Sequence, residues 1–480
     1  MGAYAGYMGG DDHGSGRGPT VAIIGGGASG TLAAVHLLRR AGAAAQPLRV
    51  LLIDKEGRHG LGRAYATTDP GHLLNSPAGR MSGLPGDPGH LVRWAEARGI
   101  EHDGFLARRD YGRYLTDLLA DARRQAWPAA RLEILRAEVT AAECPGAGLP
   151  LRLRVAGGLA PVEADIVILA TGSLPPGVPC PVPDGPGYIA DPWAPGALDG
   201  TGDGRPVIIV GTGLTMLDLA TTLTDANPAT VVHAVSRHAL LPREHRGAPA
   251  PGRPPAPALP VLTQAPLRLS ALVREVRAAA ARHPGDWQDL MDVLRPQVPD
   301  LWQRLSPADQ RLFLRRYARY WEVHRHRVPP KTAARVAALR AAGRLQVRPG
   351  QIVAAGGGPG GVRVSVAHRG TVTVLDGGWL INGTGPAADV TAVADPLLRS
   401  LLAAGLARPD PLRLGLDADG CGALLDATGH PGDRLFTLGP PLRGVRYETT
   451  AIAEIARQAE ALARHLITAS PVLASSGSAA

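Results

Sequence analysis

The chain has 480 residues, of which 45% are hydrophobic, so it is long enough for two or three domains. Its three cysteines lie far apart, which excludes a disulfide framework, a CxxC redox centre and a cysteine-rich metal site. The formal net charge is +9, but Lys55 and Lys331 are the only lysines. Such a skew towards arginine indicates a GC-rich genome rather than a nucleic-acid partner.

No apolar run is long enough to span a bilayer. The Gly-rich residues 1–19 lack the apolar core of a signal peptide, and we expect them to form a flexible tail. We therefore expect a cytoplasmic protein with no membrane, nucleic-acid or metal site. The sequence neither requires nor excludes a homo-oligomer.

In chain order, the first predicted element is a strand at residues 21–24 that runs into a glycine-rich turn. Gly25, Gly27 and Gly30 form the pattern GxGxxG, and a helix is expected over residues 31–40. The three glycines permit a tight turn, close approach of the backbone to a pyrophosphate, and close helix–strand packing. The helix N-terminus presents free N–H groups to the phosphates. This arrangement predicts a dinucleotide site.

The next predicted strand, residues 49–53, ends at Asp54. A carboxylate in this position binds the ribose hydroxyls of a dinucleotide, which strengthens the fingerprint considerably. The neighbouring Ser29 and Lys55 are added as candidate cofactor contacts.

A second unit of the same kind begins with a predicted strand at residues 207–210, followed by Gly211 and Gly213. Met216 stands where the third glycine would be, so this fingerprint is degenerate. Arg237 follows the next predicted strand, where a positive charge suits a 2′-phosphate and favours NADPH over NADH. The alternative is that Arg237 is one of many solvated arginines.

Further along, residues 247–260 are Pro-rich and predict a hinge, and residues 263–343 are predicted to be mostly helical. The helical stretch contains Trp287, Trp302 and Trp321 in a chain with only seven tryptophans. A β pattern then returns, and a closing helix is expected near the C-terminus. Strands that alternate with helices predict an α/β fold with parallel sheets.

Taken in order, these parts resemble the two-dinucleotide-binding-domain flavoproteins of the FAD/NAD(P)-binding group. They are more distantly similar to the N-hydroxylating and Baeyer–Villiger flavin monooxygenases. The resemblance extends from about residue 20 to 465, and its most specific stretches are HLLNSPAGRMS and GTGLTMLD. The segments that carry it are residues 25–30, 60–65, 72–82, 110–115, 211–218, 236–237 and 439–451.

The resemblance implies that the first site holds FAD and the second NAD(P)H. It places Asn75 and Arg80 beside the flavin, although Asn75 could equally be a turn residue and Arg80 a surface ion pair. Two further predicted strands end in glycine-containing turns, at Thr171-Gly172 and at residues 382–385. The resemblance implies that the chain crosses between the cofactor domains at these turns. Gly439 is followed by Pro440 where related chains often carry a Gly-Asp pair. Flavin contacts there would come from the backbone at Gly439 and the helix start at Thr449.

The expected architecture is therefore two Rossmann-like dinucleotide-binding domains, with the FAD domain discontinuous, plus a helical insertion. The expected parts are a tail (1–19), the FAD domain (20–204 and 344–467), the NAD(P) domain (205–262), the helical insertion (263–343) and a second tail (468–480).

The expected function is a flavin-dependent oxidoreductase that takes hydride from NAD(P)H. Most favoured is a monooxygenase that uses O₂ to oxygenate an amine or another small soft nucleophile. The alternatives are a reductase or dehydrogenase without oxygenation, and a flavin-binding protein that recruits a partner. No catalytic residue is assigned. We expect the helical insertion to cover the active-site cleft, unless its tryptophans simply form the insertion's own core.

Overall fold

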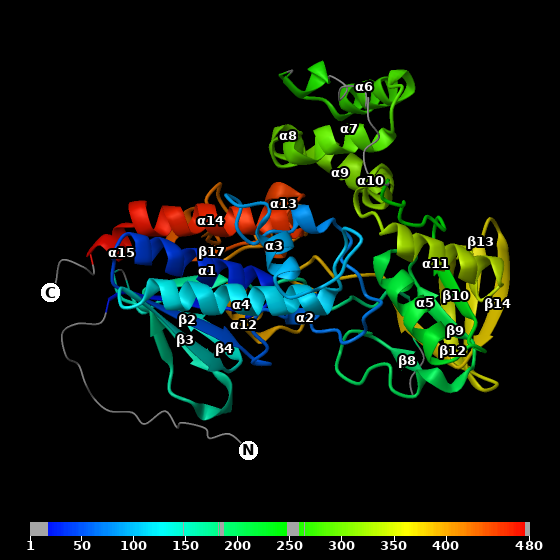
Figure 1. Ribbon diagram of the computed structural model, residues 1–480, viewed down its shortest axis with the longest axis horizontal. Helices are drawn as coiled ribbons and strands as arrows, with labels where there is room; N and C mark the ends of the chain where they lie inside the picture. Colours follow the sequence, from blue (N-terminus) through cyan, green and yellow to red (C-terminus); the bar gives the residue numbers. More distant parts are fainter. Residues whose placement is uncertain are drawn as a thin grey trace.

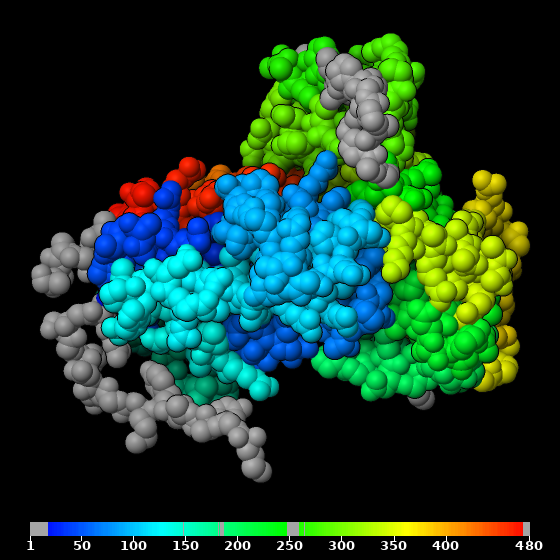
Figure 2. All heavy atoms as spheres, in the orientation of Figure 1, coloured from blue at the N-terminus to red at the C-terminus, as the bar shows by residue number. Residues whose placement is uncertain are grey.

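A computed structural model describes residues 18–146, 148–180, 182, 187–246, 259–263 and 265–475 (Figure 1). The predicted N-terminal tail and the Pro-rich hinge therefore lie almost entirely outside the described residues. Two parallel sheets lie side by side, and a group of helices stands off them at the top of the view (Figures 1 and 2). No helix among the described residues is both long and apolar enough to cross a membrane.

The first sheet has the strand order β16-β17-β7-β1-β2-β3, and every neighbouring pair is parallel except β16 with β17. Its strands are β1 (Thr20–Ile24), β2 (Leu48–Asp54), β3 (Ala130–Arg136), β7 (Ile166–Leu169), β16 (Ala423–Leu425) and β17 (Pro431–Thr437). The central strands β1 and β7 are short apolar runs buried on both faces, as parallel strands require.

Helices cover one face of this sheet, and a small antiparallel sheet with one helix covers the other. The first layer is α1 (Ala28–Ala43), α4 (Arg108–Ala126) and α14 (Ile452–Ala469), and the second is β4 (Val139–Glu143), β5 (Leu151–Val155), β6 (Val162–Ala164) and α12 (Pro396–Ala403). The shorter helices of this domain are α2 (Gly62–Tyr65), α3 (His90–Glu96), α13 (Arg443–Arg446) and α15 (Pro471–Ser475).

The second sheet has the order β11-β10-β9-β15-β8 and is entirely parallel. Its strands are β8 (Tyr188–Ile189), β9 (Val207–Val210), β10 (Val232–Ser236), β11 (Leu345–Pro349) and β15 (Trp379–Asn382). One face packs against α5 (Leu214–Ala226) and α11 (Pro330–Ala341), and the other against an antiparallel sheet. That sheet consists of β12 (Gln351–Gly358), β13 (Gly361–His368) and β14 (Thr371–Gly377).

The second domain does not end at residue 344, where we expected the chain to return to the FAD domain. Residues 345–382 belong to the second domain, because β11 and β15 pair with β10 and β9 of the second sheet, and the antiparallel sheet between them packs on it. The chain returns to the first sheet only with β16 and β17. The C-terminal region also differs from the expected tail, since α14 continues to Ala469 and Leu473 of α15 is buried in the first core.

The helical insertion leaves the second domain after β10 and returns to it at α11. It contains α6 (Leu269–Arg282), α7 (Trp287–Leu294), α8 (Val298–Arg304), α9 (Pro307–Arg316) and α10 (Ala318–Arg325). α11 belongs to the second core through Val336 and Leu339, so the insertion ends earlier than residue 343. We use "the insertion" below for the described residues from 259 to 326.

Candidate cofactor sites and the cleft between them

The turn after β1 is built so that two of its glycines cannot be replaced. A Cβ at Gly30 would lie 1.8 Å from the carbonyl oxygen of Gly25, and one at Gly25 would lie 2.3 Å from that of Ala170. Gly25 also has a φ of +109°, which favours glycine. These contacts let α1 pack directly against β1 and β7.

Gly27 is different, because the protein leaves space beside it. A Cβ there would meet only the Cα of Gly62, at 3.5 Å. Gly27 is the N-cap of α1, and no side chain caps this end of the helix. The free N–H groups and the open space suit the pyrophosphate of a dinucleotide.

Asp54 lies at the end of β2, as predicted, and its carboxylate fixes the fingerprint turn. Its Oδ2 accepts a hydrogen bond from the Gly26 N–H at 2.8 Å, and its Oδ1 accepts one from the Glu56 N–H at 2.9 Å. A carboxylate retains further acceptor capacity for ribose hydroxyls. The Lys55 ammonium is exposed and lies 3.8 Å from the Glu138 carboxylate, so it pairs with a neighbouring side chain.

Ser29, Gly439 and Thr449 meet at the start of α1, although they come from distant parts of the chain. A Cβ at Gly439 would lie 2.6 Å from the Ser29 Oγ. The Gly439 N–H donates to Gln458 Oε1, the Gln458 Nε2 donates to Thr449 Oγ1, and the Thr449 hydroxyl donates to the Gly439 carbonyl, each at 2.8 Å. The backbone of Gly439, the Thr449 hydroxyl and the Gln458 amide therefore bind one another. The sequence analysis did not identify Gln458.

The second fingerprint repeats the first. A Cβ at Gly211 would lie 2.5 Å from the Gly383 carbonyl oxygen, just as Gly25 faces Ala170. Gly213 is the uncapped N-cap of α5, and a Cβ there would meet nothing within 4 Å. The segment at Thr171-Gly172 thus contacts the first fingerprint turn, and the segment at residues 382–385 contacts the second. At both segments the chain crosses from one domain to the other. Arg237 is exposed just after β10, a position that suits a 2′-phosphate contact and a solvated arginine alike.

A cavity of about 300 Å³ lies between the two domains, near the start of α5. Residues of both domains line it, among them Tyr65, Asn75, Arg108, Ser173, Trp193, Thr215, Asp218, Asn382 and Thr450. No residue of the insertion lines it in the part of the chain that the structure describes. Ligands of open parallel sheets bind at the carboxyl ends of the strands, which makes this cleft the candidate active site.

An ion pair joins the two domains inside this cleft. The Asp218 carboxylate on α5 lies 2.7 Å from the Arg108 guanidinium, although the alignment falls short of a hydrogen bond at Asp218 Oδ2. Burial raises the pKa of Asp218, while the charge of Arg108 opposes that shift. Asp218 is the last residue of the GTGLTMLD stretch that carries the resemblance, but the sequence did not predict its pairing with Arg108.

A second group of polar contacts crosses the same border. The His72 Nε2 lies 2.9 Å from the Thr222 Oγ1, and the Thr222 hydroxyl donates to Asp69 Oδ2 at 2.7 Å. His72 is buried, and Trp193 packs against its ring. The relative position of the two domains is therefore held by specific side-chain contacts on both sides of the cleft.

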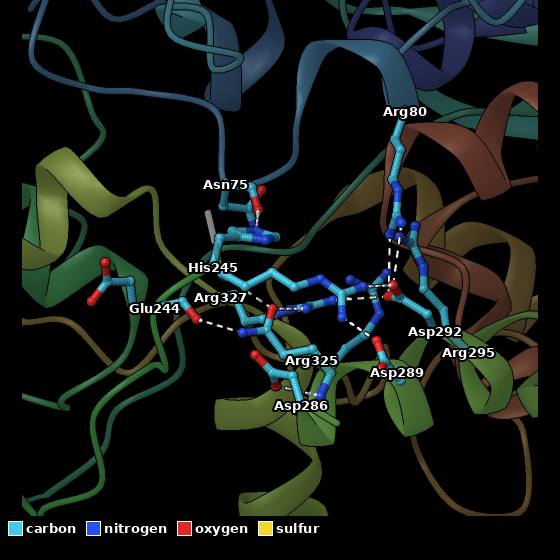
Figure 3. Close-up of polar contacts among 12 residues, drawn as sticks. Asn75, Arg80, Glu244, His245, Asp286, Asp289, Asp292, Arg295, Arg325 and Arg327 are labelled. Carbon is cyan, nitrogen blue, oxygen red and sulfur yellow. Dashed lines mark hydrogen bonds and ion pairs between the residues drawn. The ribbon is translucent and has the colours of Figure 1, made fainter. Parts of the chain in front are cut away.

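Asn75, a predicted flavin contact, lines the cleft, but Arg80 points elsewhere (Figure 3). The Asn75 carbonyl oxygen lies 3.0 Å from His245 Nε2, and burial lowers the pKa of His245 to about 4. Arg80 extends to the insertion, where its guanidinium binds the Asp292 carboxylate at 3.2 and 3.3 Å. Asp292 also pairs with Arg246 and Arg327. This matches the alternative of an ion pair for Arg80.

Comparison with known proteins supports the architecture. Residues 22–174 match the family model described as FAD-NAD(P)-binding. No curated protein sequence matches the chain significantly. Among the described residues, no group of three His, Cys, Asp or Glu side chains could hold a metal ion.

Solved flavoprotein structures share the fold over nearly the whole chain. Ornithine N-hydroxylase from Kutzneria sp. 744, with reduced FAD, NADP⁺ and L-ornithine, has a TM-score of 0.61 at 17% identity, covering 94% of this chain and 99% of its own. L-lysine 6-monooxygenase from Pseudomonas syringae gives 0.62 at 17% identity, with coverages of 94% and 99%. The FAD-bound cadaverine monooxygenase of Erwinia amylovora gives 0.62 at 12% identity, with coverages of 95% and 96%. The predicted α/β fold with two dinucleotide-binding domains is confirmed.

Proposed function

We propose that this chain, whose residues 22–174 match the FAD-NAD(P)-binding family model, is an FAD-dependent NADPH oxidoreductase. It binds FAD at the Gly25–Gly30 turn and NADPH at the Gly211–Gly213 turn. The observation that carries the proposal is the pair of open helix N-termini at Gly27 and Gly213, which both lie close to one cleft. Gly62, beside Gly27, directly precedes the lining residue Arg63, and Gly213 directly precedes the lining residue Leu214. Hydride transfer needs two dinucleotides that meet face to face, and this arrangement supplies two sites and a common space.

The residues present fit these cofactors. Gly27 and Gly213 are free of protein contacts that would forbid a side chain, whereas Gly30 and Gly25 are tightly packed. Steric contacts within the fold do not require glycine at the two open positions, and the absence of a side chain there leaves room for the pyrophosphates. Asp54 would bind ribose hydroxyls at the first site, and Arg237 a 2′-phosphate at the second.

Within the cleft, the chain's own residues orient the ligands and restrict water. The Arg108–Asp218 pair and the contact between His72 and Thr222 hold the two domains together. Bound flavin supplies hydride acceptance and, when reduced, reaction with O₂. Asn75 and Thr450 line the same cavity and are the candidate positioning residues there.

The substrate that we favour is a small amine, oxygenated with O₂. Support comes from the ornithine N-hydroxylase, the L-lysine 6-monooxygenase and the cadaverine monooxygenase of similar fold. A reductase without oxygenation is the second candidate, because bacillithiol disulfide reductase from Staphylococcus aureus also has a related fold, with a TM-score of 0.54 at 10% identity.

The test uses the purified holoprotein with a panel of diamines and amino acids. NADPH oxidation, peroxide and hydroxylamine are followed together. Hydroxylamine formed in proportion to NADPH consumed supports the monooxygenase, whereas NADPH consumption that yields only peroxide or a reduced acceptor supports the reductase. A flavin that NADPH fails to reduce contradicts both and leaves a binding protein.

A further inference from the structure

The insertion contains an apolar cavity that is separate from the cofactor cleft. Its volume is about 450 Å³, and it is surrounded by α6 to α10 and closed on one side by Tyr447. The tryptophans that we expected to cover the cleft line this cavity instead. Side chains of α6 border it with helical spacing, at residues 269, 272, 273, 276 and 280.

The walls of the cavity are fixed by contacts with the first domain. The Trp302 ring stacks on the Tyr447 ring at 4.7 Å, and its Nε1 donates to the Gly444 carbonyl at 2.6 Å. The Trp321 Nε1 donates to Glu448 Oε1 at 2.8 Å, while the buried Arg325 holds Glu448 Oε2 at 2.9 Å. The polar edges of the two indoles are thus satisfied outside the cavity, and their apolar faces remain available to it.

Among the described residues, the charge on the cavity lining itself is positive, whereas the carboxylates of Glu448 and Glu322 are not part of the lining and accept hydrogen bonds from Trp321 and Tyr447. None of its twenty lining residues is acidic, and the only cation among them is the exposed Arg277. Arg277 has no ion pair with any residue that the structure describes. A second guanidinium, that of Arg319, lies 4.8 Å from the ring centroid of the lining residue Tyr320. A ligand that fills the cavity would therefore meet positive charge at its polar end.

We propose that this cavity binds the alkyl chain of a medium-chain carboxylic acid, with the carboxylate at Arg277. At about 30 Å³ for each methylene-sized group, the volume of a water molecule in the liquid, the space holds about fifteen non-hydrogen atoms, and a twelve-carbon carboxylate has about fourteen. Ligand pockets of this size are typically apolar with a few placed polar groups. This inference goes beyond the proposed function and does not depend on it.

The experiment measures binding of saturated fatty acids of increasing length to the full-length holoprotein, below their micelle concentrations, by calorimetry and tryptophan fluorescence. Each added methylene that enters the cavity should tighten binding by roughly fourfold. The increase should stop near twelve carbons, when the cavity is full. Dodecylamine, which carries the opposite charge, should bind more weakly than dodecanoate.

Two matched pairs of variants on α6 locate the site. Ala280→Trp fills the cavity from its exposed side and should abolish dodecanoate binding, whereas Ala281→Trp, one residue along and outside the lining, should not. Arg277→Gln should weaken dodecanoate by about two- to fivefold and leave dodecanol unchanged. Arg274→Gln, equally exposed but outside the lining, should have no effect.

Several results would overturn the proposal: no binding, affinity independent of chain length, or equal losses in Ala280→Trp and Ala281→Trp. A stable dimer that Ala280→Trp dissociates and dodecanoate does not would assign the apolar surface to a second copy of the chain. Flavin reduction by NADPH is measured on the same samples. Normal flavin reduction without dodecanoate binding would refute this inference and leave the proposed function intact. Dodecanoate binding without flavin reduction would refute the proposed function and leave this inference intact.

Discussion

Replacing Gly27 and Gly30 separately with alanine distinguishes a glycine required by a ligand from a glycine required by the fold. A Cβ at Gly30 would lie 1.8 Å from the Gly25 carbonyl oxygen, so Gly30→Ala forces α1 away from β1. We expect the apoprotein to lose at least about 3 kcal/mol of unfolding free energy, the upper end of overpacking effects. A Cβ at Gly27 has only an ordinary contact with Gly62, and its φ of −69° suits alanine.

Gly27→Ala should therefore change the unfolding free energy of the apoprotein by no more than about 1 kcal/mol. Its FAD affinity should fall by about ten- to a hundredfold, the loss of one charge-assisted hydrogen bond of roughly 1.5–3 kcal/mol. Urea unfolding of the apoproteins and fluorescence titration with FAD measure the two quantities. Gly213→Ala serves as the matched control, because it should bind FAD normally and lose affinity for NADPH. Unchanged FAD affinity in Gly27→Ala would refute the assignment of the first site.

Three further predictions concern the second site, the interdomain contacts and pH. Arg237→Ala should weaken NADPH by about ten- to a hundredfold and leave NADH unchanged in titrations of both nucleotides; equal losses for the two would remove Arg237 from the site. Asp218→Ala leaves the Arg108 guanidinium unpaired and should cost about 3 kcal/mol in urea unfolding, and a loss below about 0.5 kcal/mol would contradict a structural pair. Burial lowers the pKa of His245 to about 4 in the folded protein. The unfolded chain binds a proton near the ordinary value and the folded chain does not, so stability should fall as the pH decreases from about 6.5 to 4. His245→Gln should remove that part of the pH dependence, and identical stability profiles for the two proteins would refute it.

The first fingerprint was predictable because each of its residues acts through short-range geometry. The strand, the three glycines and Asp54 are close in sequence, and the structure places them as the spacing predicts. The second fingerprint was equally visible despite Met216, which is fully buried and takes the place of the third glycine through packing.

Contacts between distant segments were not predictable. The Arg108–Asp218 pair joins residues 110 positions apart, and no local pattern marks it. The position of β11 depends on its pairing with β10 across the whole insertion, so local periodicity did not show that the second domain continues past residue 344. Gln458 was missed for a different reason: it lies within α14, and its contacts with Gly439 and Thr449 depend on how the segment before that helix folds back.

Anaerobic reduction of the bound flavin tests the central claim most directly, because it requires both sites and the cleft at once. Purified holoprotein is mixed with NADPH without oxygen, and the visible flavin absorbance is followed alongside Gly213→Ala. We predict complete bleaching with NADPH in the wild-type protein and much slower bleaching in the variant at the same nucleotide concentration. Flavin that stays oxidised in the wild-type protein, or that is bleached equally fast in Gly213→Ala, would contradict the account.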